Sequence, residues 1–171
     1  FAIKDDHNQL AQETAEIFRE FLQDEVFTPA DVNKAEWAPA NNNPTLLYDF
    51  NAPSNPWLPN DYNENCGGFG LYLSANEIMS VLAHARYDDA YLQPQYQDLL
   101  FEEFMGMRQR SGDHGTYPAH GGDWMSSGRG MTGVVMTFPI NVDVTLLINS
   151  RGGNHPEKYT IVREAFDNAW E

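Results

Sequence analysis

Cysteine is almost absent from the sequence, and this scarcity excludes two kinds of stabilising site. Cys66 is the one cysteine among 171 residues. A single thiol cannot form a disulfide within the chain, and it cannot supply the several thiolates of a zinc cage. Because Cys66 precedes two glycines, we interpret it as a small packed residue and not as a reactive thiol. The cysteine count leaves the compartment open, and a periplasmic or secreted location remains one alternative.

Positive charge is also scarce, which argues against two classes of partner. The chain has 10 Lys and Arg residues against 25 Asp and Glu residues, a formal net charge of −15. Such a charge repels nucleic-acid phosphates and anionic lipid surfaces at long range. The sequence also has no basic leader and no apolar run long enough to span a bilayer. We therefore expect neither nucleic acid nor membrane as a partner.

Several compact catalytic motifs are missing as well. The sequence has no Walker-type glycine-rich loop, no Gly-x-Ser-x-Gly elbow and no His-x-x-x-His pair. The closest two histidines in the sequence are His114, in a predicted loop, and His120, in the predicted strand that follows. Asp113 and Asp123 are near them in the sequence. This arrangement does not match the spacing of a zinc site. We expect neither a metal nor a cofactor.

Apolar periodicity predicts four helices. They cover residues 12–27, a segment starting near Ala75, residues 95–107 and a C-terminal segment entered at Asn154-His155-Pro156. Ser74 and Glu77 form a capping box at the start of the second helix. The first helix carries an apolar stripe, made of Ile17, Phe18, Phe21, Leu22 and Val26.

The rest of the chain predicts strands and a long loop. Prolines in residues 33–65 favour an ordered loop region with one short strand at 45–50. Alternating apolar residues predict strands at 116–121, 129–138 and 142–149. A turn at Pro139 to Asn141 makes an antiparallel meander the simplest topology. We therefore predict an α+β fold in which about three antiparallel strands are packed by the C-terminal helix, with residues 1–110 mainly helical and loop.

The motif with the most chemical content lies on the first of these three strands. It reads Tyr117-Pro118-Ala119-His120-Gly121-Gly122-Asp123. His120-Gly121-Gly122 resembles the third active-site motif of the serine β-lactamase and penicillin-binding-protein superfamily, in its class C and esterase-like branch. That motif is Lys-Thr-Gly or a variant such as His-x-Gly, on an edge strand beside the catalytic serine. The order of Gly67-Gly68, the Ser74 helix and the three strands is similar to the family too, so the resemblance covers nearly all of residues 1–171.

The resemblance implies a role for each residue of the motif. His120 would orient a substrate carboxylate or the proton-transfer network. The backbone N–H of Asp123 would be the second donor to the oxyanion. Gly121 and Gly122 would let a substrate backbone lie against the strand. The implied substrate is a small molecule or peptide: a β-lactam, a D-amino-acid peptide or a small ester.

Two motifs that this chemistry needs do not occur in the chain. No serine is followed by lysine at the third place, and no tyrosine by asparagine at the second. The first residues, Phe1-Ala2-Ile3, resemble those that follow Tyr-x-Asn in the family. We therefore interpret the chain as the C-terminal portion of one β-lactamase-like domain, which is not an enzyme alone. The N-terminal part of the same protein, joined or cleaved, would supply the nucleophile and a strand beside 142–149.

Other interpretations remain open at this point. The chain could belong to a β-lactamase-like module that only binds or supports other molecules, or to a two-chain enzyme nicked before Phe1. In Pro29-Ala30-Asp31-Val32 the sequence departs from the family's Pro-Leu-Gly-Met turn. His120 could be an ordinary strand histidine beside a glycine-rich hairpin. Trp57 and Trp124 fit either the lining of a cleft or simple loop packing.

Overall fold

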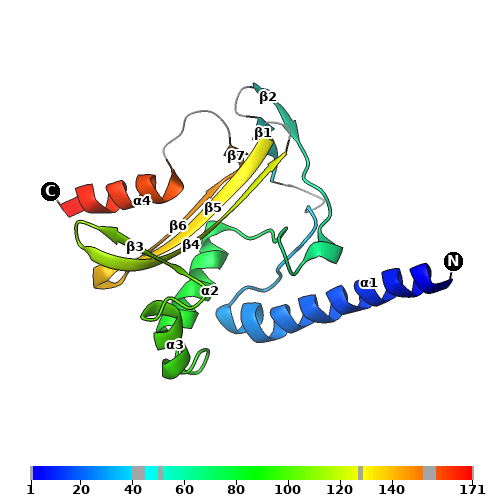
Figure 1. Cartoon of the computed structure of the whole chain (residues 1–171), viewed down its shortest axis with the longest axis horizontal. Helices are drawn as coiled ribbons and strands as arrows, with labels where there is room; N and C mark the ends of the chain where they lie inside the picture. Colours follow the sequence, from blue (N-terminus) through cyan, green and yellow to red (C-terminus); the bar gives the residue numbers. More distant parts are fainter. Residues whose placement is uncertain (1, 40–44, 50–51, 127–128, 152–156, 171) are drawn as a thin grey trace. The chain divides into compact units, whose positions relative to one another are not determined.

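The computed structural model of the chain describes residues 2–39, 45–49, 52–126, 129–151 and 157–170 (Figure 1). It has an α+β fold, as the sequence predicted. Contacts divide the chain into two compact units. The first comprises Phe1–Thr45 and Leu58–Val81, and the second comprises Leu46–Trp57 and Leu82–Glu171.

A long helix forms most of the first unit. The α-helix α1 covers Ala2–Leu22, and it continues as a π-helical turn at Gln23–Phe27 and a 3₁₀ turn at Thr28–Ala30. The predicted helix at 12–27 is therefore present and begins earlier. It ends where Asp31 adopts the left-handed conformation, with a φ of 60°.

The apolar stripe of this helix is only half covered. Leu22 and Val26 pack against the buried core of the unit, which consists of Phe27, Val32, Ala35 and Trp37. Ile17 and Phe21, by contrast, are 66% and 57% exposed. No apolar side chains of the described residues bury Ile17 and Phe21, so this part of the stripe is not a core face.

Tyr62 anchors the loops of the first unit. Its backbone N–H donates to the carbonyl of Trp37, and its ring contacts those of Phe69 and Tyr72. Gly70 has a φ of +92°, and a Cβ at this residue would lie 2.2 Å from the Cβ of Tyr62. The position therefore requires glycine for both conformation and space.

The helices of the middle of the chain follow the sequence prediction in part. α2 covers Ala75–Tyr87 and is entered through the predicted capping box, in which the backbone N–H of Ser74 donates to Glu77 and the backbone N–H of Glu77 donates to the Ser74 hydroxyl. α3 covers Pro94–Phe101 and is shorter than predicted. Phe104 and Gly106 have positive φ angles of 56° and 74°, which are incompatible with a helix that continues to Met107.

The strands belong to the second unit (Figure 1). They are β1 at Leu47–Asp49, β2 at Ala52–Trp57, β3 at Arg108–Gly112, β4 at Gly115–Ser126, β5 at Arg129–Phe138, β6 at Val142–Ile148 and β7 at Ser150–Arg151. Strands β3, β4, β5 and β6 form an antiparallel meander. β1 and β2 form an antiparallel pair, and β1 is paired with β5 at Asp49 and Arg129. The three predicted strands and the short strand predicted at 45–50 correspond to β4, β5, β6 and β1, whereas β2, β3 and β7 were not predicted.

The core of the second unit lies between this sheet and the last helix. α4 covers Lys158–Asp167 and is followed by a 3₁₀ turn at Asn168–Trp170. Buried residues of β4 and β5 pack with buried residues of α4 in one cluster, which consists of Tyr117, Ala119, Val134, Met136, Phe138, Tyr159, Val162 and Phe166. The predicted entry to this helix, Asn154 to Pro156, falls outside the described residues.

Candidate functional site

The predicted site residues lie in the middle of β4, and strand alternation sorts them onto two faces. Tyr117 and Ala119 pack in the α4 core. Successive side chains of a strand point to opposite faces, so Gly121 and Asp123 share the α4 face. His120, Gly122 and Trp124 consequently lie together on the other face.

His120 is exposed on that face and has one defined hydrogen bond. Its Nδ1 lies 2.9 Å from the carbonyl oxygen of Gly106, just before β3. A carbonyl oxygen can only accept, so Nδ1 carries the proton in this bond. In the neutral ring Nε2 is then an acceptor. The hydrogen bond to Gly106 therefore orients the imidazole and leaves Nε2 as the ring nitrogen that can accept a hydrogen bond.

One edge of β4 is only partly covered. β3 pairs with β4 from Gly115 to Ala119, and the last of these pairs joins Ala119 to Arg108. From His120 to Ser126, no described strand pairs with this edge. A two-residue loop joins the paired residues Gly112 and Gly115, so these two exchange backbone hydrogen bonds. Every second residue after Gly115 then directs its N–H and C=O toward the same edge. The backbone N–H of Asp123 points to this edge.

The two glycines of the motif have different structural surroundings. A Cβ at Gly121 would lie 2.7 Å from the carbonyl oxygen of Gly133, 2.8 Å from the Tyr159 hydroxyl and 2.9 Å from Cε of Lys158. Gly121 is therefore required by the packing of α4. A Cβ at Gly122 would have no atom of the described residues within 4 Å. The His120 face is thus open at Gly122, whereas the α4 face is closed at Gly121.

This difference predicts opposite outcomes for two neighbouring substitutions. Gly121→Ala should lower the free energy of unfolding by about 1–3 kcal/mol, because its methyl group overpacks the contact with α4. Gly122→Ala should change it by less than about 0.5 kcal/mol, since the new methyl group meets open space. Urea unfolding of both variants measures the difference. Equal losses in the two variants would contradict these surroundings.

The side chain of Asp123 lies on the α4 face and not at the edge of β4 to which its backbone N–H points. Its carboxylate forms an ion pair with the buried Lys158, with 3.0 Å between Oδ1 and Nζ, and it accepts a hydrogen bond from the hydroxyl of Thr132. Lys158 Nζ also donates to the carbonyl of Gly122 at 2.9 Å. These contacts hold the Gly122–Asp123 peptide against α4, so the carboxylate acts in positioning the strand.

Charged residues of β6 and α2 meet on the same face of the sheet as His120. Arg86 of α2 forms an ion pair with Asp143 of β6, and the Tyr87 hydroxyl donates to the same carboxylate at 3.3 Å. Burial raises the pKa of Tyr87, and the negative charge of Asp143 raises it further. The phenol is therefore neutral at physiological pH, and this cluster anchors the end of α2 to the sheet.

Two tryptophans form a feature that sequence reasoning left undecided. Trp124 of β4 and Trp57 of β2 have ring centroids 5.6 Å apart, with an angle of 36° between their planes. They are far apart in the sequence, and the pairing of β1 with both β2 and β5 brings them into the same unit. No local pattern in the sequence indicates such a contact.

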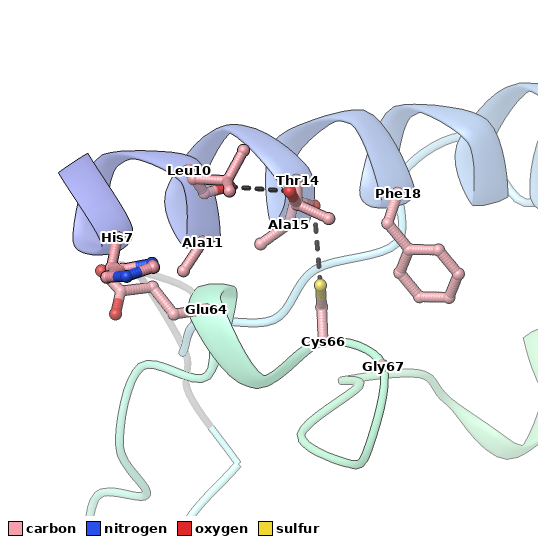
Figure 2. A pocket seen from close by; sticks show the side chains of 9 residues that line it. All are labelled: His7, Leu10, Ala11, Thr14, Ala15, Phe18, Glu64, Cys66 and Gly67. Atoms are coloured by element: carbon pink, nitrogen blue, oxygen red, sulfur yellow. Dashed lines mark hydrogen bonds between the residues drawn. The ribbon is translucent and has the colours of Figure 1, made fainter.

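Two cavities lie among the described residues of the first unit. One, of about 460 Å³, lies along α1 and is lined by Leu10, Ala15, Phe18, Cys66 and further residues (Figure 2). The thiol of Cys66 faces the helix and donates to the carbonyl of Ala15 at 3.5 Å. Cys66 is half-buried and packs with the apolar core of this unit. These contacts agree with the interpretation of Cys66 as a packing residue.

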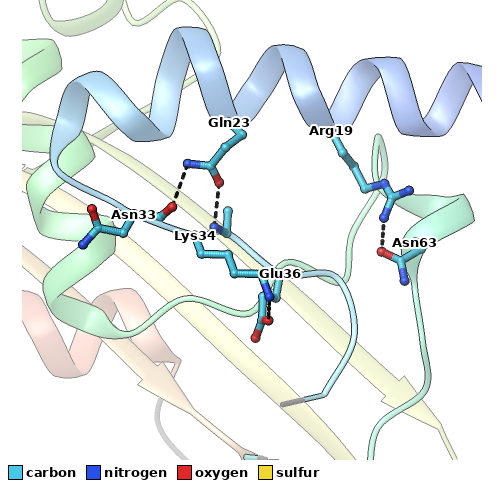
Figure 3. Close-up of polar contacts among 7 residues, drawn as sticks. Arg19, Gln23, Asn33, Lys34, Glu36 and Asn63 are labelled. Carbon is cyan, nitrogen blue, oxygen red and sulfur yellow. Dashed lines mark hydrogen bonds and ion pairs between the residues drawn. The ribbon is translucent and has the colours of Figure 1, made fainter. Parts of the chain in front are cut away.

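The second cavity, of about 540 Å³, lies beside the end of α1, and most of its lining residues are polar or charged. Gln23 spans part of it: its Oε1 accepts from the backbone N–H of Ala35 at 2.8 Å, and its Nε2 donates to the carbonyl of Asn33 at 3.4 Å (Figure 3). The same Nε2 also donates to the carbonyl of Val32 at 3.0 Å. Lys34 pairs with Glu36 at the rim of this cavity. The polar groups here hold the loop after α1 to the helix.

The remaining histidines and acidic residues do not gather into a metal site in the described part of the chain. Within it, no group of three or more His, Cys, Asp and Glu side chains could hold a metal ion. His114 makes an edge-on contact with the Phe166 ring at 5.6 Å, so it packs over the sheet core. No helix among the described residues has both the length and the apolarity needed to cross a bilayer.

Known proteins provide no further constraint on the site. Comparison of the chain with protein-family models, with curated proteins and with solved structures gave no match.

Proposed function

We propose that this chain is the C-terminal part of a serine acyl-transfer hydrolase resembling the β-lactamases and penicillin-binding proteins. In this proposal the outer edge of β4 after Ala119 borders the acyl-transfer site. The observation that supports it most is the combination of an edge that no described strand covers, an outward-directed N–H at Asp123 and open space at Gly122. An extended substrate can add to such an edge through backbone hydrogen bonds.

The proposed reaction has two steps. A serine oxygen attacks the substrate carbonyl carbon, an ester bond forms, and the bond from that carbon to its nitrogen or oxygen leaving group breaks. The proton of the serine hydroxyl passes to the leaving atom. Water then hydrolyses the ester, which releases the acid and restores the serine. The substrate class is a β-lactam, a D-amino-acid peptide or a small ester.

The residues of β4 have separate roles in this proposal. The backbone N–H of Asp123 donates to the oxygen that becomes negatively charged when the carbonyl is attacked. His120, oriented by the carbonyl of Gly106, presents Nε2 to a substrate carboxylate or to the proton-transfer network. Gly122 leaves room for the substrate, while Gly121 allows α4 to hold the strand in place.

The nucleophile and the rest of the domain would come from the N-terminal part of the same protein. Two exposed features of this chain fit such a partner. Ile17, Phe18 and Phe21 of the α1 stripe are exposed, and so is Leu10 of the same helix. The edge of β6 opposite β5 has no strand partner among the described residues. Uncovered apolar surface and uncovered strand edges favour association with further polypeptide.

Covalent labelling of the complete protein, with its N-terminal part present, tests this proposal. After incubation with a fluorophosphonate probe or benzylpenicillin, the intact mass should rise by one acyl or phosphonyl group. Peptide mapping should place that group on a serine outside the 171 residues of this chain. Heat-denatured protein is the control and should remain unlabelled. A native protein that gains no mass with either probe would indicate a module that only binds or supports other molecules.

A further inference from the structure

The contact between Trp57 and Trp124 creates an aromatic surface beside the edge of β4. The two rings are tilted by 36° at a centroid distance of 5.6 Å. Both side chains are half-buried, so part of each ring remains accessible. Aromatic rings bury a large apolar area and bind other rings in tilted or offset arrangements.

This aromatic pair stands at one end of a gap in the side-chain layer of the sheet. His120, Gly122 and Trp124 lie on one face of β4, and His120 and Trp124 are separated by four residues, about 13 Å of extended strand. Between them Gly122 contributes no side chain, and a Cβ there would have no atom of the described residues within 4 Å.

The gap ends at the next strand. Gly133 of β5 is paired with Gly122, so two residues without side chains stand opposite each other. The space over Gly133 is, however, filled by Leu147 of β6, whose Cδ2 lies 3.1 Å from the position of a Gly133 Cβ, so the open space is confined to Gly122. The gap therefore has an imidazole at one end, tryptophan rings at the other and an aliphatic side chain behind it.

The side chains around this gap fit a ligand that has both an apolar ring and a polar group. A flat apolar group can lie against the tryptophans, while a polar group of the same molecule reaches His120. Resting on the proposed function, we propose that Trp57 and Trp124 form a subsite for an aromatic side group on the acyl part of the substrate. The pair then determines specificity and takes no part in the chemical step.

Acylation kinetics of the complete protein test this subsite. Benzylpenicillin carries a phenylacetyl group, and 6-aminopenicillanic acid has the same ring system without it. Trp124→Leu should lower the second-order acylation rate constant for benzylpenicillin about tenfold, a loss typical of one aromatic contact with its buried area. The constant for 6-aminopenicillanic acid should stay unchanged. Trp124→Phe should restore most of the rate.

A neighbouring variant and the pattern of losses separate this role from a structural one. Met125→Leu alters the next residue of β4, on the opposite face, and should leave both constants unchanged. If Trp124→Leu lowers both constants equally, or neither, the subsite is refuted.

A second measurement does not depend on acylation. The indole N–H NMR signals of Trp57 and Trp124 in the complete protein should shift on titration with phenylacetamide. If neither penicillin acylates the wild-type protein, the proposed function fails, but a shift of both signals still upholds the aromatic subsite. Signals that do not move up to the solubility limit of phenylacetamide refute it.

Discussion

Phe138→Ala is expected to lower the free energy of unfolding of the sheet-containing unit by about 3–5 kcal/mol. Phe138 is 1% exposed, and its ring stacks on Phe166 of α4 at 4.0 Å and contacts Tyr117 of β4 at 4.7 Å. It therefore joins β4, β5 and α4 in one contact. Removal of the ring leaves a cavity at the junction of these three elements, and chemical unfolding followed by circular dichroism measures the loss.

Leu147→Ala is the matched control for this substitution. Leu147 lies on the neighbouring strand β6, but it is 44% exposed and lies on the face opposite α4. Its truncation should cost less than about 1 kcal/mol. Equal losses for Phe138→Ala and Leu147→Ala would mean that the core between the sheet and α4 does not hold the unit together.

The parts of the fold that the sequence predicted well are those with local signals. Alternating residues and the turn at Pro139 predicted β5 and β6, and both strands occur within one residue of the expected bounds. The Ser74–Glu77 capping box predicted the start of α2. In each case short-range chemistry and tertiary packing favour the same structure.

The strands that the sequence failed to predict lack such signals. β2 contains Pro53 and Pro56, which usually interrupt strands, but it lies at the edge of the sheet, where a missing N–H is tolerated. β3, with the sequence Arg-Gln-Arg-Ser-Gly, has no apolar alternation, and its residues are largely exposed. Pairing with β4 through a tight turn makes it a strand, and this partner is not visible in the local pattern.

For the candidate site, the sequence could indicate which strand carries the residues but not which contacts their side chains make. The sequence indicated the strand at His120 and assigned to Asp123 a role for its backbone. It could not indicate that the Asp123 carboxylate binds Lys158 or that Gly121 is needed by Tyr159, because both contacts involve a distant helix. The contact of Trp57 with Trp124 likewise depends on tertiary structure.

Gly122→Val in the complete protein should slow acylation by benzylpenicillin about 100-fold. The isopropyl group would fill the open space beside the outer edge of β4, and a substrate displaced by about 1 Å from its reactive position loses about this factor. The fold should be unaffected, since valine is favoured in strands and no described atom lies within 4 Å of the new Cβ. An unchanged urea midpoint is therefore the control for this variant.

The acylation rate constant of Gly122→Val relative to wild type, measured by mass spectrometry over time, tests most directly whether a substrate occupies this part of the sheet. We predict a loss of about 100-fold with an unchanged unfolding midpoint. A variant that is acylated as fast as the wild-type protein would show that the reacting carbonyl does not lie beside β4.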